Sequence, residues 1–316
     1  MKTFLIILAI VSGLAIIIAI ILGEIFFTMG MRRSDKVVRI SKRAKNTGDD
    51  KPLVEHWDMK NKWAFEHGAV EISQKSYDGL KLRALLVENP GHTDRFCIIC
   101  HGYTGHAAEM GFYAEKFYDK GFSTMLPAAR GHDISEGKYI EFGWPERKDI
   151  CGWIDYINAN YDSPQIVVYG VSMGAASVMM AVGEPLPDNV KCAIEDCGYS
   201  SIIEQLKHSF KNMLKLPPNL LIWIGSISIK LYTGINIWRD GFATKQLAKC
   251  HIPMLFMHGT EDRFVPFEML DKCYNAHPGP KEKLAIEGAV HASSAYTGGE
   301  MYWNKIFDFV NKYIDK

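Results

Sequence analysis

The chain begins with a long apolar segment. From Thr3 to Gly23 there are 21 residues without a charge, mostly Ile, Leu and Ala, and a helix of this length spans a hydrocarbon core of about 30 Å. A cleaved signal peptide would have an apolar region of about 7–15 residues followed by a small-x-small cleavage site. Here Leu22-Gly23-Glu24-Ile25-Phe26-Phe27 follows instead. We therefore predict that residues 1–30 form a retained transmembrane anchor, which makes the lipid bilayer a partner through residues 3–23.

A basic, polar stretch follows this segment, and we interpret residues 31–62 as a juxtamembrane linker. Basic residues crowd its first half: Arg32, Arg33, Lys36, Arg39, Lys42, Arg43 and Lys45. The positive-inside rule then favours a single-pass protein of the cell membrane with its catalytic domain in the cytoplasm. A short charged start is also typical of exported anchors, so the extracellular side stays open. The basic run either holds anionic lipid head groups or is a solvated linker.

Beyond residue 62 the spacing of apolar positions changes. Residues 69–76 and 80–88 alternate between apolar and polar and are joined by turn residues, which predicts a β-hairpin. Six short apolar runs follow, most of them trailed by a helix-like segment: 96–100, 123–127, 165–169, 191–195, 254–258 and 283–286. Strands alternating with helices predict a mainly parallel sheet covered on both faces, in one α/β domain over residues 63–316. Ligands of such sheets bind beyond the carboxyl ends of the strands.

One apolar insertion of about 199–245 breaks this rhythm. It is either a cap over the active site or a second membrane-contacting element. Its interruption by Pro217-Pro218, Gly225, Lys230 and Gly234 argues against a second spanning helix, so we favour a helical cap. Trp223 and Trp238 are candidates for lining a substrate pocket under that cap, although packing is the commoner role of such residues.

Composition narrows the function classes. The 36 basic and 36 acidic residues cancel, so nothing in the net charge would attract nucleic acid. The 12% of aromatic residues and the net charge of zero exclude intrinsic disorder. Seven irregularly spaced cysteines favour reduced, buried thiols, which mildly favours a cytosolic setting. Cys97-Ile98-Ile99-Cys100-His101 matches a haem-attachment pattern, but on a strand the two thiols would point to opposite faces, and we read them as buried.

The strongest chemical signal follows the run at 165–169. Gly170-Val171-Ser172-Met173-Gly174 leads into a good helix, which is G-x-S-x-G in the strand–turn–helix setting of a nucleophile elbow. Only small residues fit beside the serine in so tight a turn. We predict that Ser172 is a nucleophile.

A serine needs a base that is oriented by an acid, and in this setting they follow in the order Ser, Asp, His. Asp262 follows the run at 254–258, and His291 follows the last run. We predict Asp262 as the acid and His291 as the base. Glu261 is the alternative acid, and either carboxylate could instead cap the helix that begins near Pro266.

The tetrahedral intermediate of acyl transfer needs two converging N–H donors. We expect them from the backbone of Met173 and of Tyr103, the latter in the loop that follows the run at 96–100. The other histidines show no metal-ligand spacing, and we predict no metal. His132 and His258 lie where they could support the site.

These motifs together resemble the α/β-hydrolase superfamily, specifically membrane-anchored bacterial serine hydrolases related to the esterase, monoacylglycerol lipase and acylaminoacyl peptidase branches. Five blocks occur in the expected order: His101-Gly102-Tyr103-Thr104-Gly105, Arg130-Gly131-His132, Gly170-Val171-Ser172-Met173-Gly174, His258-Gly259-Thr260-Glu261-Asp262 and His291. The resemblance implies an eight-stranded sheet, a cap after the sixth strand and Ser-His-Asp acyl transfer without a cofactor. It does not fix the substrate.

We therefore expect a serine hydrolase acting on a small-molecule carboxylic ester, with an apolar or lipid-derived acyl group. An acylaminoacyl-type peptidase or a thioesterase would use the same triad. A non-catalytic membrane scaffold is the alternative outside enzymes, and it would be indicated by a damaged triad, whereas all expected residue types are present.

Overall fold

The computed structural model describes residues 1–33, 62–91, 94–213 and 218–314. Its centre is an eight-stranded sheet in the order β1-β2-β4-β3-β5-β6-β7-β8. The β1–β2 and β2–β4 pairs are antiparallel and all later pairs are parallel. The strands are β1 Val70–Lys75, β2 Lys81–Val87, β3 Arg95–Cys100, β4 Ser123–Pro127, β5 Gln165–Val171, β6 Val190–Asp196, β7 Met254–Gly259 and β8 Lys281–Ile286.

The predicted α/β fold with its hairpin and six further strands is confirmed, with strand ends within two residues of the predicted runs. The helical elements are α1 Lys2–Gly30, α4 Trp63–Glu66, η2 Ala107–Met110, α5 Gly111–Tyr118, α6 Glu146–Asn160, α7 Met173–Ala181, α8 Ile202–His208, η3 Ser209–Met213, α9 Pro218–Thr233, α10 Ala243–Leu247, α11 Glu268–Ala276 and α12 Ser294–Val310.

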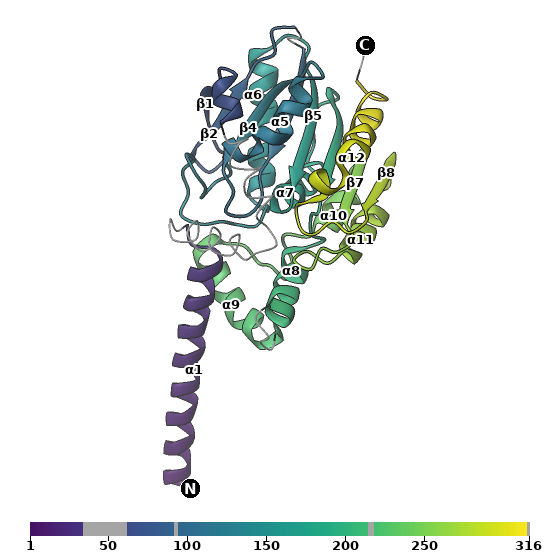
Figure 1. The fold of residues 1–316 in the computed structure, drawn as a ribbon. Coiled ribbons are helices and arrows are strands. Elements are labelled where there is room, and N and C mark those ends of the chain that lie inside the picture. Colours follow the sequence, from purple (N-terminus) through teal and green to yellow (C-terminus); the bar gives the residue numbers. More distant parts are fainter. Residues whose placement is uncertain (34–61, 92–93, 214–217, 315–316) are drawn as a thin grey trace.

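Helices cover both faces of the sheet (Figure 1). Buried residues of α6, α7, α10 and α11 form one hydrophobic cluster, and those of α4, α5 and α12 form the other. Strand β3 contributes to both, because alternate side chains point to opposite faces. Cys100 lies in the first cluster and Cys97 in the second, as predicted, and both are buried thiols.

The insertion between β6 and β7 is helical. It contains α8, the short π-helix η3 and α9, and its two ends are closed by a bridge between Ser201 and Phe242. In Figure 1 this insertion lies on the side of the domain from which α1 extends. Helix α9 packs along the carboxyl-terminal part of α1.

The end of α1 is built into the catalytic domain. Phe27 and Met31 are fully buried in the first hydrophobic cluster. Beyond the helix, Arg32 forms a bridge with Tyr139, and the Arg33 guanidinium donates a 2.6 Å hydrogen bond to the Ser135 carbonyl. The first residues of the predicted linker therefore lie against the domain, and the rest of the linker falls outside the described residues. Among the described residues, α1 is the one helix long and apolar enough to cross a membrane, a property that a signal sequence shares.

Candidate active site

Ser172 lies at the sharp turn between β5 and α7, in the backbone conformation of a nucleophile elbow. Its φ of 58° and ψ of −117° are rarely adopted by a residue with a side chain, and the turn holds it there. A Cβ on Gly170 would overlap the Gly174 carbonyl, and a Cβ on Gly174 would overlap the Cys100 carbonyl. Glycine is thus required on both sides of the serine, as the motif predicts.

Three predicted residues come together at the carboxyl ends of their strands. The Ser172 hydroxyl lies 2.8 Å from His291 Nε2, and His291 Nδ1 lies 2.6 Å from Asp262 Oδ2. With Nδ1–H donating to the carboxylate, Nε2 is left to accept the serine proton. This arrangement has the geometry of a Ser-His-Asp triad.

Asp262 is held as a carboxylate by several donors. Its Oδ1 accepts hydrogen bonds of 2.9 Å from the backbone N–H groups of Phe264 and Val265. Burial favours the protonated acid, but hydrogen bonds from His258 and His291 outweigh burial and hold the pKa of Asp262 well below its ordinary value. Asp262 therefore caps the turn after β7 and contacts His291. It does not cap the next helix, because α11 begins at Glu268 and has no side-chain cap.

His258 lies behind this carboxylate, fully buried. Its Nε2 is 3.3 Å from Asp262 Oδ2 and 3.0 Å from the Val265 carbonyl. Burial disfavours the charged imidazole, but the hydrogen bond with Asp262 and the nearby Glu195 raise its pKa. His258 thus supports the position and the charge of Asp262, as its place in the sequence suggested.

The alternative acid points elsewhere. Glu261 is 55% exposed and lies 3.8 Å from the guanidinium of Arg263. The structure brings Asp262, and not Glu261, to the imidazole of His291.

The expected oxyanion donors lie on either side of the serine. Gly102 packs so closely that a Cβ on it would be 3.4 Å from Ser172 Cβ, which brings Tyr103 near this serine. Among residues 62–91, 94–213 and 218–314, no backbone acceptor takes the N–H of Tyr103 or of Met173. Both donors are therefore available for a developing oxyanion.

Two buried histidines hold the loop of residues 101–105, which we call the oxyanion loop. His101 Nε2 accepts from the Ala129 N–H at 3.0 Å, and His132 Nε2 accepts from the Thr104 N–H at 3.2 Å. Burial lowers the pKa of His101 and lowers that of His132 to about 3. Both imidazoles remain neutral at physiological pH, as acceptors must.

The oxyanion loop also contacts the end of α1. The Tyr103 hydroxyl donates a 2.8 Å hydrogen bond to the Gly30 carbonyl, and its ring stacks on Phe142 at 5.6 Å. This hydrogen bond joins two residues that are 73 positions apart in the sequence. Sequence analysis missed this contact because no local pattern links the N-terminal apolar helix to the loop after β3.

The two tryptophans predicted to line a substrate pocket are not brought to the triad. Trp223 is 58% exposed on α9. The Trp238 indole N–H donates a 3.0 Å hydrogen bond to Ser226, which turns this side chain towards α9. A ring that does pack on the triad is Phe264, whose centroid is 4.7 Å from that of His291.

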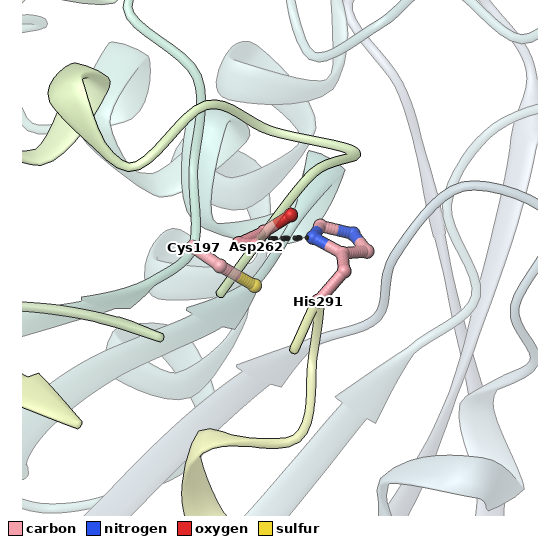
Figure 2. Close-up of side chains that lie close together, drawn as sticks. All are labelled: Cys197, Asp262 and His291. Atoms are coloured by element: carbon pink, nitrogen blue, oxygen red, sulfur yellow. Dashed lines mark hydrogen bonds and ion pairs between the residues drawn. The ribbon is translucent and has the colours of Figure 1, made fainter. Parts of the chain in front are cut away.

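Cys197 lies close to Asp262 and His291 (Figure 2). All three side-chain types can bind a metal ion, and their potential ligand atoms lie within 4.8 Å of one another. Burial raises the pKa of this thiol well above its ordinary value, which favours the neutral form that binds metals poorly. A metal would also have to displace the hydrogen bond between His291 and Asp262. The donor set fits a hydrogen-bonded triad better than a metal centre.

Comparisons with known proteins point to hydrolases. Residues 91–225 match the family described as "Serine aminopeptidase, S33". The chain is 25% identical to the uncharacterized protein YqkD of Bacillus subtilis, over 100% of this chain and 99% of YqkD. It is 27% identical to the α/β hydrolase domain-containing protein WAV2 of Arabidopsis thaliana, over 77% of this chain and 79% of WAV2.

Solved structures give the same fold. An esterase of Pyrococcus furiosus superposes with a TM-score of 0.65 at 20% identity, over 79% of this chain and 94% of the esterase. The strand order, the elbow after β5 and the family match point to one conclusion. The chain has the α/β-hydrolase fold, and these similarities support the α/β-hydrolase superfamily.

Proposed function

We propose that this protein is a membrane-anchored serine hydrolase that cleaves carboxylic esters with an apolar or lipid-derived acyl group. The observation that carries the proposal is the continuous hydrogen-bonded chain from Ser172 through His291 to Asp262. An isolated serine is a weak nucleophile, and an imidazole in this geometry activates it.

In the proposed mechanism, His291 Nε2 accepts the hydroxyl proton as Ser172 Oγ attacks the ester carbonyl carbon. The N–H groups of Tyr103 and Met173 stabilise the oxyanion, and the imidazolium then protonates the leaving alcohol. Water attacks the acyl-enzyme by the same route in reverse. Asp262 keeps the imidazole in the required tautomer and stabilises its positive charge.

The anchoring part of the proposal rests on α1. Its exposed apolar length suits a membrane span, and burial of Phe27 and Met31 in the catalytic domain supports retention of the helix. Similarity to YqkD extends over the whole chain, this helix included. The basic residues after the helix favour a cytoplasmic catalytic domain.

Peptide hydrolysis is the second candidate. The family matched by residues 91–225 is described as a serine aminopeptidase, and the triad geometry serves an amide as well as an ester. A thioester would be attacked in the same way.

The test uses the full chain in detergent with p-nitrophenyl esters of increasing acyl length, aminoacyl p-nitroanilides and acyl thioesters. We expect turnover of esters that Ser172→Ala abolishes. Asp262→Asn should reduce kcat about 10⁴-fold, as removal of a triad acid does elsewhere. Glu261→Gln is the matched control and should retain full activity, because this side chain is exposed.

Faster cleavage of the anilides than of the esters would favour the peptidase. A folded protein that hydrolyses none of the three substrate classes would overturn the proposal and favour the scaffold.

A further inference from the structure

Helix α9 presents an apolar stripe on its outer side. Leu220, Trp223, Ile227 and Leu231 are spaced by three or four residues, so they lie on one face of the helix. Their exposed fractions run from 54% to 75%. Large apolar side chains gathered on one exposed face indicate an interaction surface.

The other side of α9 is already occupied. Ile222, Ile224 and Ile229 are buried. At Gly225 the helix approaches the ring of Phe26 so closely that a Cβ would overlap it, and at Ser228 it meets Gly23 of α1. These contacts fix which face of α9 is turned outward, so the stripe is not turned towards α1.

The helix that carries the stripe packs beside the end of the apolar segment of α1. In Figure 1, α9 lies beside the upper end of α1, where the helix joins the domain. The contacts of α9 with Gly23 and Phe26 put it at the end of the uncharged segment 3–23, where a spanning helix leaves the hydrocarbon. An amphipathic helix at this level meets the boundary between head groups and acyl chains.

The charge of the insertion suits the same partner. Residues 205–238 contain four lysines and no Asp or Glu. Lys211 and Lys230 are exposed. Lysines beside an apolar stripe attract anionic head groups while the stripe enters the acyl region.

We propose that α9 is an interfacial membrane helix, whose stripe inserts into the acyl boundary of an anionic bilayer beside α1. This inference rests on the proposed anchoring by α1 and not on the proposed esterase activity. It gives Trp223 a role at the membrane interface, where tryptophan side chains are enriched, in place of the predicted role in a substrate pocket.

The test measures membrane depth on the full chain. The variants Ile227→Cys and Leu231→Cys are labelled with an environment-sensitive fluorophore and reconstituted into vesicles of phosphatidylcholine and phosphatidylglycerol. Lipids that carry a nitroxide quencher on the upper acyl chain then report contact. The labelled parent protein gives the background from the seven native cysteines, six of which are buried. Lys272→Cys on α11 is the matched exposed control.

We expect quenching at both stripe positions to exceed that at position 272 at least threefold, and phosphatidylglycerol to increase it. A third label, at Ile10→Cys, reports on α1. Quenching at position 10 without quenching at 227 and 231 would overturn the inference while leaving the anchor intact. No quenching at position 10 would overturn the anchoring and the inference with it. If the labels at 227 and 231 are not quenched and copies of the protein cross-link to each other, the stripe contacts a second chain and the inference is overturned.

Discussion

Replacing Tyr103 by Phe tests whether the end of α1 positions the oxyanion loop. The substitution removes the hydroxyl that donates to the Gly30 carbonyl at 2.8 Å. It leaves the ring in place, stacked on Phe142 with the planes 6° apart. Burial raises the pKa of Tyr103 to about 12, so the hydroxyl keeps its proton and donates at any pH of assay.

The expected loss follows from the bond itself. A neutral hydrogen bond contributes about 1 kcal/mol net, and the half-buried Gly30 carbonyl can turn partly to water once its donor is lost. If the loop then no longer holds the Tyr103 N–H for the oxyanion, a loss of about 1–2 kcal/mol in the transition state lowers kcat about 5- to 30-fold. KM should change little, because the donor acts on charge that develops only in the transition state.

The assay is hydrolysis of the best p-nitrophenyl ester by the full chain, with thermal unfolding measured in parallel. Tyr161→Phe is the matched control, because its hydroxyl donates a hydrogen bond to Glu88, and neither of these two residues contacts the oxyanion loop. We expect both variants to lose similar stability and only Tyr103→Phe to lose kcat. Equal kcat values in the two variants would refute the positioning role of the contact with α1.

Two further substitutions test the electrostatics and the packing around the site. Burial raises the pKa of Glu195 to about 8 from its ordinary 4.5. The folded protein thus keeps a proton that the unfolded chain has lost, so the free energy of unfolding falls as pH rises from about 5 through 8, by about 1.4 kcal/mol per unit at most. In denaturant titrations at pH 5, 7 and 9, the free energy of unfolding of Glu195→Gln should fall less with pH than that of the parent protein. An equal fall in both proteins would contradict the raised pKa of Glu195. Gly225→Ala should lower the free energy of unfolding by about 1–3 kcal/mol, because the new Cβ overlaps the Phe26 ring. Gly13→Ala is the control and should have no such effect, because a Cβ there meets nothing within 4 Å. Equal unfolding temperatures for the two variants would contradict the close packing of α9 on α1.

The sheet and the elbow were predictable because their signals are local. A buried parallel strand is a short apolar run, and a nucleophile elbow needs glycine where the backbone crowds, as Gly174 against the Cys100 carbonyl illustrates. Each of these features lies within a few residues of sequence. The choice of Asp262 over Glu261 came from the resemblance and from chain order. Its physical reason, two backbone N–H donors that fix the carboxylate, is visible only in the fold.

The end of α1 shows what sequence patterning leaves out. Hydrophobic periodicity identifies an apolar run that is long enough to cross a bilayer. It does not show whether the last turn of that run lies in water, in lipid or in a protein core. Only the packing of Phe27 and Met31 tells these apart. Once that turn is part of the core, the position of α1 is coupled to the position of Tyr103 through the hydrogen bond to Gly30. With α1 as the proposed membrane anchor, a chain built this way would hold Ser172 at a fixed height above the bilayer, which a flexible tether would not do.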